Sequence, residues 1–448
     1  MAAAALHEDV LADVLRRLEP RPLAASRCVC KAWRALIDSR RSKLCVGLLP
    51  RSLAGIYIGQ ATASSNLPGF FAHRTSSVSG TLHFLPSSTA TAGDKPPPRR
   101  YEIQDHCNGL LLLDNRVVVN PATRWWSSPL PPRPPPRMGA STFGAEFLVY
   151  DPAVSSRYEV FSIPCFRRNC SACYCCPSDN KSGDEPVLMN ELSEWPPLLH
   201  TLDVYSSSTG RWEERTFHRQ GEAAGTIADM RFDLSGHKCK AVYWQGALYV
   251  HYKTYFIMRI SLSDGKYQVI KMPMVRVVND YPHFCLGRSE KGVYLALVIQ
   301  SRLLQVWVLN KSYDKMEWVL KHDKDLNLGL PRQTHRRWIL QDLDKDLRYR
   351  EEPNEENFQW SSDDDNNDIK RVHMFYRNRY HGNMDVLGFH PYKEIVFLCE
   401  AMQTGLAFHL NTSKIDILGN LHLVSSCDKV LSNTRFTGVS LPYTPCWM

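Results

Sequence analysis

The sequence predicts a mainly β protein with a small all-helical module at its N-terminus. Three observations lead to this fold class. Between residues 6 and 37 the apolar residues recur at helical spacing. From about residue 46, short apolar or alternating segments follow one another between turns that contain glycine and proline. The clearer of these strand–turn–strand units recur about every 40–50 residues, a period typical of the blades of a β-propeller.

Three helices are expected in the N-terminal module. The first should end before Pro20 and Pro22, because proline lacks an amide hydrogen and disfavours helix in the residue before it. A short second helix is expected over residues 23–27 and a third over 30–39. The first and third helices are each expected to carry one apolar stripe. The stripes are formed by Leu6, Val10, Leu11, Val14, Leu15 and Leu18 in the first helix, and by Val29, Ala32, Trp33, Leu36 and Ile37 around the third. So small a module buries little surface, so it either presents apolar side chains to a partner or caps the next domain.

The strand-rich region begins at about residue 46 and extends to residue 448. Paired segments fall at residues 107–126, 147–161, 202–212, 241–269, 292–318 and 396–417. Each pair is expected to form antiparallel strands closed by a strand that bears an aromatic, so Trp125 and Trp126 are expected in a core. A propeller of six to eight blades is favoured, and one or two β-sandwiches are the alternative. Disordered insertions are expected near residues 86–100, 166–186 and 348–370, the last of them strongly acidic.

The charge of the chain is distributed unevenly. Lysine and arginine total 54, aspartate and glutamate total 46, and the net charge is +8. Residues 1–45 carry nine basic and five acidic side chains, so half of the excess lies in this short module. An excess this small, confined in this way, argues against a nucleic-acid binder and for a partner-facing surface.

The first 45 residues also resemble an F-box. The resemblance rests on the run from Leu6 to Leu18, then Leu23, and then the Val-Cys-Lys-x-Trp ending over residues 29–33. It departs from the family where His7 replaces the usual proline. It implies that residues 1–45 dock on a Skp1-like adaptor, and through it on a cullin, within an SCF-type ubiquitin ligase. The residues assigned to adaptor binding by this resemblance are Leu6, Leu11, Leu18, Leu23, Val29, Lys31 and Trp33.

A looser resemblance covers the rest of the chain. Asn108-Gly109-Leu110-Leu111-Leu112 and the later Val119-Asn120-Pro121-Ala122-Thr123-Arg124 are similar to the F-box-associated, kelch-like domain of plant F-box proteins, and residues 48–57 resemble grass members of that group. The resemblance implies a non-catalytic substrate receptor, with the F-box over residues 1–45 and a propeller over 46–448 that holds an unidentified target protein. The alternative is a propeller enzyme or small-ligand-binding protein whose helices are only a structural cap.

A cysteine-rich segment is the one candidate for a metal site. Cys165, Cys170, Cys173, Cys175 and Cys176 offer enough thiolates for a tetrahedral zinc ion. Two adjacent cysteines are poor ligands for one ion, so a polar, redox-sensitive loop is favoured over zinc.

Neither catalysis nor secretion is indicated. The sequence contains no P-loop, His-Glu-x-x-His or Gly-x-Ser-x-Gly motif, and no cofactor is expected. The first residues lack the basic start and apolar run of a secretory signal, and no segment approaches the ~18 apolar residues of a membrane span. The cytoplasm or the nucleus is therefore the expected location, with neither nucleic acid nor membrane as a partner.

Overall fold

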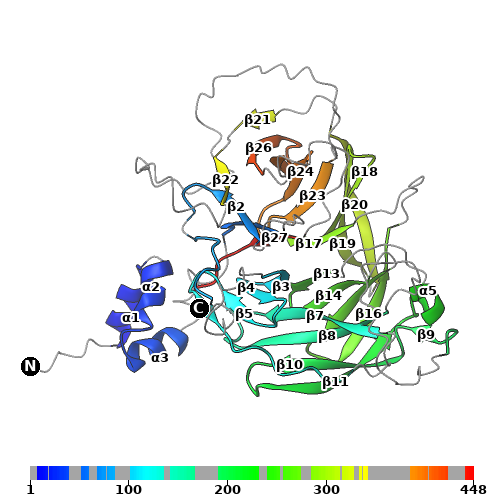
Figure 1. The fold of residues 1–448 in the computed structure, drawn as a ribbon, viewed down its shortest axis with the longest axis horizontal. Coiled ribbons are helices and arrows are strands. Elements are labelled where there is room, and N and C mark those ends of the chain that lie inside the picture. The colour runs from blue at the N-terminus through cyan, green and yellow to red at the C-terminus, as the bar shows by residue number, and fades with distance from the viewer. Residues whose placement is uncertain are drawn as a thin grey trace, which may run out of the picture.

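The computed structural model of the chain consists of a helical module and a ring of β-sheets (Figure 1). It describes residues 8–18, 20–39, 52–59, 68–76, 78–85, 101–135, 142–166, 190–231, 240–252, 256–273, 284–312, 315–326, 332–334, 337–341, 384–401, 403–421 and 439–447. The predicted insertions near 86–100 and 348–370 lie outside these residues, as does the insertion near 166–186 except for Phe166, which ends a strand.

The module contains α1 (Glu8–Arg16), α2 (Pro20–Ser26) and α3 (Lys31–Ser39). Glu8 and Asp9 stand in the first turn of α1 and Arg16 in its last, which is the order that suits the helix dipole. The second helix begins at Pro20, three residues earlier than predicted, because proline at the start of a helix has no amide hydrogen to leave unpaired. Arg27 pairs with Asp38 at 3.0 Å and joins the end of α2 to α3.

In the described residues the strands of the ring fall into six groups, here called blades and numbered along the ring; blades 3 and 4 share one eight-stranded sheet, because β11 pairs in parallel with β16 at their outer edges. Blade 1 contains β1 (Gly55–Ile58), β2 (Gly69–His73), β22 (Trp338–Gln341) and β27 (Ser440–Tyr443). Blade 2 contains β3 (Ile103–Cys107), β4 (Leu110–Leu113), β5 (Val118–Asn120) and β6 (Trp125–Trp126). Blade 3 contains β7 (Thr142–Tyr150), β8 (Tyr158–Phe166), β10 (Leu199–Ser206) and β11 (Arg211–Gln220).

The other three blades follow in chain order. Blade 4 contains β13 (Lys240–Trp244), β14 (Ala247–Tyr252), β15 (Phe256–Ser261) and β16 (Lys266–Lys271). Blade 5 contains β17 (Cys285–Ser289), β18 (Gly292–Ile299), β19 (Leu303–Ser312) and β20 (Lys315–Asp325). Blade 6 contains β23 (Met384–Phe389), β24 (Ile395–Glu400), β25 (Thr404–His409) and β26 (Ile415–Asn420), with β21 (Arg332–Thr334) at its outer edge.

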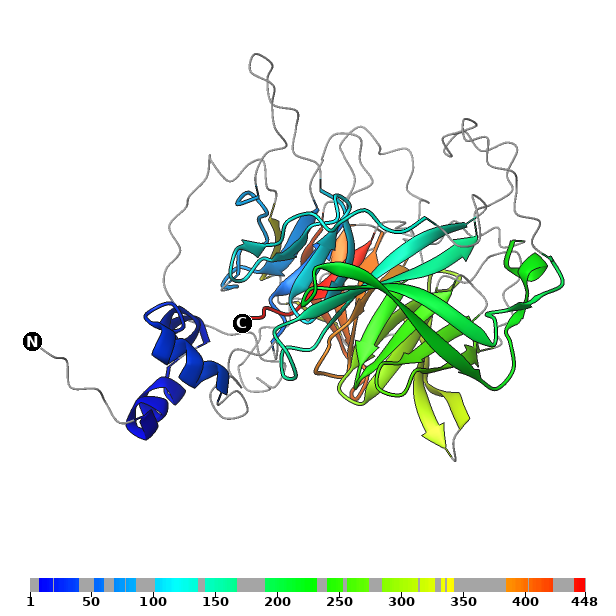
Figure 2. The same cartoon turned by 90° about the horizontal axis from the view of Figure 1, so that it is seen from below.

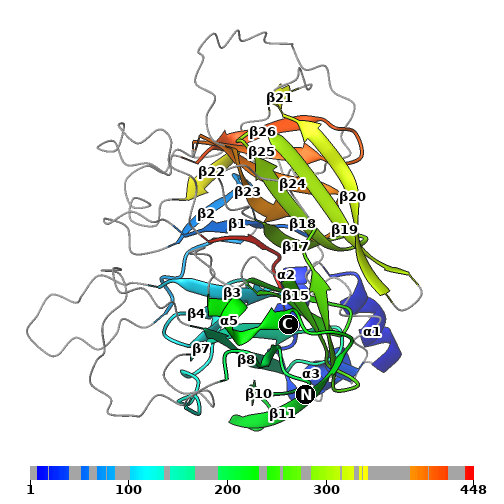
Figure 3. The same ribbon diagram turned by 90° about the vertical axis from the view of Figure 1, so that its right-hand side faces the viewer.

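The inner strands close into a ring. In the described residues, β27, β3, β7, β13, β17 and β23 each contact the next, and β23 contacts β27 again. Closure depends on the first and last strands of the β region, because β27 pairs with β1 over Gly55–Ile58 inside blade 1 (Figure 3). This propeller-like arrangement confirms the predicted fold class, a helical module followed by a β-propeller. The alternative of one or two β-sandwiches does not describe it.

One hydrophobic cluster fills each space between neighbouring blades. For example, Tyr57 and Phe70 of blade 1 pack against Leu111 and Val119 of blade 2. A cluster of this kind joins each of the other pairs of neighbouring blades in the described ring, which explains why both faces of most strands are apolar. Sheets that bury both faces need aromatic and branched side chains on each of them.

Two predictions about the strands were wrong. The segments 147–161 and 202–212 were taken as separate units, but β8 of the first pairs with β10 of the second, so both belong to blade 3. Trp125 and Trp126 were expected in a core. Both are exposed, because β6 is the outer edge strand of its blade and has a partner on one side only.

Candidate functional site

An exposed apolar face lies on the helical module. The side chains of Val10, Val14, Leu18 and Val29 are 50%, 51%, 36% and 63% exposed. Val10, Val14 and Leu18 recur every four residues, so they form one stripe along α1 and the turn that follows it. Large apolar side chains gathered on a small module mark a surface that a partner covers.

A second stripe of α1 builds the core of the module. Leu11 and Leu15 face Leu23 of α2 and Leu36 and Ile37 of α3, and all five are buried. Two indoles, of Trp33 and Trp447, pack against this core. Trp447 also packs against the cluster between blades 1 and 2, so the end of the chain joins the module to the ring. Figures 1 and 2 both show the helices beside the C-terminus of the ring.

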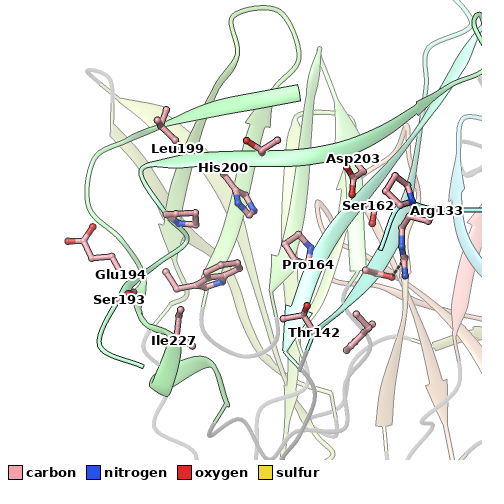
Figure 4. A pocket seen from close by; sticks show the side chains of 16 residues that line it. Arg133, Thr142, Ser162, Pro164, Ser193, Glu194, Leu199, His200, Asp203 and Ile227 are labelled. Carbon is pink, nitrogen blue, oxygen red and sulfur yellow. Dashed lines mark hydrogen bonds between the residues drawn. The ribbon is translucent and has the colours of Figure 1, made fainter. Parts of the chain in front are cut away.

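A groove lies on the face of blade 3 that is turned toward blade 2. We call it the blade-three groove; it encloses about 390 Å³ and is lined by β7, β8 and β10, by residues 133–134 and by the loop 193–197 (Figure 4). It exists because the strands of blade 3 have 8–10 residues whereas those of blade 2 have 2–5, so blade 2 leaves part of that face uncovered.

Hydrogen bonds hold the walls of the blade-three groove. On one side Arg133 Nη1 donates to the carbonyl of Gly144 at 2.9 Å. On the other side, Arg219 donates to the carbonyl of Pro196 and to Glu194, each at 2.5 Å. Trp195 is buried and packs edge-on against Phe166 and His200, at ring distances of 4.9 and 5.4 Å. Burial lowers the pKa of His200 to about 4, so this imidazole is neutral at physiological pH.

Polar groups also converge where the inner strands meet. Arg288 of β17 donates to Asn108 Oδ1 at 2.5 Å, and Asn108 Nδ2 donates to the Tyr150 carbonyl at 2.6 Å. Burial, aided by the positive charges of Arg288 and Lys240, lowers the pKa of His106 to about 4. These residues come from different blades, so their proximity carried no signal in the sequence. The Asn108–Tyr150 bond links blade 2 to the neighbouring blade 3, and the Arg288–Asn108 bond links blade 5 to blade 2 across the ring.

Asp105 provides a test of this inner region. Its carboxylate accepts a hydrogen bond from the Leu148 amide at 2.7 Å, and burial raises its pKa to about 7. The folded state holds the proton of Asp105 more tightly than the unfolded chain does. The free energy of unfolding therefore falls as the pH rises from about 4 to 7. We expect Asp105→Asn to gain stability relative to the wild type over this range, by on the order of 1–3 kcal/mol. Urea unfolding at pH 5 and pH 8 measures this difference, and a pH-independent difference would contradict it.

The comparisons with known proteins identify the module. Residues 5–45 match the F-box domain. A candidate F-box protein of Arabidopsis thaliana is 30% identical over 162 residues, which are 35% of this chain and 41% of that protein. The chain therefore spans about two fifths of that relative. A candidate 6-phosphogluconolactonase of Bacteroides fragilis superposes over 88% of this chain and 96% of its own, with 10% identity and a TM-score of 0.29, a likeness too weak to bear on function.

The F-box places its sequence-predicted residues in two groups. Leu18, Val29 and Lys31 are exposed, whereas Leu11 and Leu23 lie in the core and Trp33 is partly buried against it. Leu6 lies outside the described residues. Sequence reasoning did not assign Val10 and Val14 to the outer face. The four-residue spacing of Val10 and Val14 was the available signal. In so small a module, α1 cannot bury both this pair and the pair Leu11 and Leu15.

The cysteine-rich segment is described only at its start. Cys165 is fully buried in the core between blades 3 and 4, and Cys170, Cys173, Cys175 and Cys176 lie outside the described residues. Within the described ranges no group of three or more histidine, cysteine or acidic residues could hold a metal ion. In the same ranges, no helix has the length and apolar character to cross a membrane.

Proposed function

We propose that the chain is the substrate receptor of an SCF-type E3 ubiquitin ligase. The F-box docks on a Skp1-like adaptor, and through it on a cullin, and the propeller-like ring holds a target protein. The observation that carries the proposal is the exposed stripe Val10, Val14 and Leu18, together with the exposed Val29, on a module that matches the F-box domain. Binding of a partner to a face of this kind is favourable, because it removes apolar surface from water.

The core residues of the F-box have a supporting role in this proposal. Leu11 and Leu23 are buried in the free chain, so they hold α1 and α2 in place while Leu18 and Val29 contact the adaptor. Lys31 is exposed and supplies a positive charge at the start of α3. The excess of basic residues in 1–45 suits an acidic adaptor, and the affinity should then fall as salt is raised.

The proposed role needs no bond-making residue in this chain. A receptor that binds both ligase and target raises the local concentration of target lysines near the ubiquitin-loaded enzyme. Trp447 supports such a role, since it packs on both the F-box core and the ring and so limits how the two move relative to each other. Such a subunit would work in the cytoplasm or the nucleus.

Adaptor binding tests the proposal. We expect the full chain to bind a purified Skp1-like adaptor in isothermal titration calorimetry. We expect Leu18→Asp to weaken this binding by about 100-fold, because a carboxylate must be desolvated at a site that fits an apolar side chain. Leu320→Asp, on β20 of the ring, is the matched control, since Leu320 is also large, apolar and exposed. Absence of binding by the wild type, or equal binding by Leu18→Asp, would count against the proposal.

A further inference from the structure

The rim of the blade-three groove is apolar and open to solvent. Phe143 and Leu199 line the groove from β7 and β10, and both are exposed, as is the neighbouring Leu198. Behind them Trp195, Pro164 and Ile227 form an apolar floor. An open cavity with exposed apolar side chains at its mouth is the form of a site that accepts a bulky apolar group from a partner.

The opposite end of the groove is polar. Figure 4 shows Asp203, Ser162 and Arg133 together at one end of the cavity, and Ser193, Glu194 and Ile227 at the other. Thr201, also in the lining, shares a 2.9 Å hydrogen bond with Thr216 of the next strand. An occupant therefore meets apolar surface over part of its length and hydrogen-bonding groups over the rest.

The charged side chains that line the groove are Arg133, Glu194 and Asp203, so carboxylates outnumber cations in the lining by one. In the pair of Glu194 with Arg219, the carboxylate side chain is 68% exposed and the guanidinium only 6%, so solvent meets the acid. Asp203 lies directly opposite the exposed Glu214 on the neighbouring strand β11. Arg133 is turned toward the Gly144 carbonyl and lies 3.5 Å from Glu146. On a chain with a net charge of +8, this acidic surface favours a basic partner over an acidic one.

The groove is built before any ligand arrives. The loop 193–197 is fixed by backbone bonds from Ile227 to Ser193 and from Ala224 to Trp195, at 3.0 and 2.9 Å. The opposite wall is fixed where Trp212 Nε1 donates to the Pro131 carbonyl at 3.0 Å. A preformed site loses little conformational entropy on binding, so a short segment suffices to occupy it.

We propose that the blade-three groove binds a segment of the target protein in which a bulky apolar side chain stands next to a lysine or arginine. The apolar side chain enters between Phe143, Leu199 and Trp195, and the basic group lies toward the carboxylate of Asp203, at the end of the groove opposite Glu194. This inference rests on the proposed receptor function and names the class of target that the receptor recognises.

Short labelled peptides test this assignment on the full chain. The probes carry leucine, phenylalanine or tryptophan between two lysines, and matched probes carry alanine at the centre or glutamate at the flanks. Fluorescence anisotropy should show binding about tenfold tighter with a large centre than with alanine, as burying such a side chain predicts. Lysine flanks should bind about tenfold tighter than glutamate flanks in low salt, and this ratio should shrink in 0.5 M salt.

Variants of the chain locate the site. Leu199→Asp should weaken the lysine-flanked leucine peptide by at least about tenfold, because it places a charge where apolar surface is required. Asp203→Asn should reduce mainly the preference for lysine over glutamate flanks. Leu320→Asp, far along the chain on blade 5, is the control and should bind as the wild type does.

Three outcomes with the full chain would overturn the inference. They are no binding of any probe, equal binding of lysine- and glutamate-flanked probes, and unchanged binding by Leu199→Asp. Binding that appears only after residues 168–188 are removed would instead assign the groove to the chain's own segment, which also overturns it. Adaptor binding, measured on the same samples, separates the two hypotheses: the receptor proposal fails if the wild type does not bind the adaptor, whatever the peptides do.

Discussion

Replacement of Tyr443 with alanine is expected to lower the free energy of unfolding by about 3–5 kcal/mol, the largest effect of any single change proposed for the ring. Tyr443 ends β27, the strand that closes the ring on β1, and its side chain is 1% exposed. Its ring lies 5.4 Å from that of Tyr57 and 6.3 Å from that of Phe70. Alanine leaves a cavity among these aromatic rings at the point where the first and last strands of the β region pair.

The hydroxyl of Tyr443 makes a smaller, separable contribution. It donates to the Gly109 carbonyl at 3.2 Å and accepts from the Ala122 amide at 3.3 Å, both in blade 2. Tyr443→Phe should therefore cost about 1–2 kcal/mol, since it removes these bonds and keeps the ring. Denaturant unfolding followed by circular dichroism measures both changes, with Val154→Ala, at a side chain that is 79% exposed, as a control within about 0.5 kcal/mol. A Tyr443→Ala variant as stable as the wild type would show that β27 does not close the ring.

Aspartate at Val14 should leave the F-box folded and aspartate at Leu15 should unfold it, and both changes should weaken adaptor binding. The two residues are neighbours in α1, but Val14 is 51% exposed and Leu15 is 1% exposed. Val14→Asp should change stability by less than about 1 kcal/mol and weaken adaptor binding by about 100-fold. Leu15→Asp places a carboxylate in the core of the F-box, so the module should unfold and binding should be lost with it.

Helical circular dichroism of the full chain and titration calorimetry with the adaptor distinguish these outcomes. Val14→Ala serves as the mild control, because it shortens the exposed side chain without adding charge. If Val14→Asp binds the adaptor as tightly as the wild type, the exposed stripe is not the docking face. If Leu15→Asp keeps its helical signal and its affinity, the core assigned to Leu11, Leu15 and Ile37 is wrong.

Local sequence patterns predicted the elements well where each pattern depends on near neighbours. The four-residue recurrence of apolar side chains in α1, the proline-marked break before α2 and the strand pairs from residue 107 onward all correspond to described elements. The distribution of charge was also visible in the sequence, since the basic excess in residues 1–45 belongs to the module that matches the F-box domain. Such features follow from backbone geometry and side-chain periodicity within a few turns of the chain.

Tertiary contacts decided the rest. Nothing local indicates that β8 pairs with β10 across a long insertion, that β27 returns to β1, or that Trp447 reaches the F-box core. The blade-three groove arises from a mismatch in strand length between two blades, which only their packing reveals. The sequence by itself determined that α1 carries apolar residues at helical spacing, and it predicted a single stripe. Only the tertiary structure decided that Leu11 and Leu15 face inward and Val14 outward, because a three-helix core has room for one stripe and leaves the other to water.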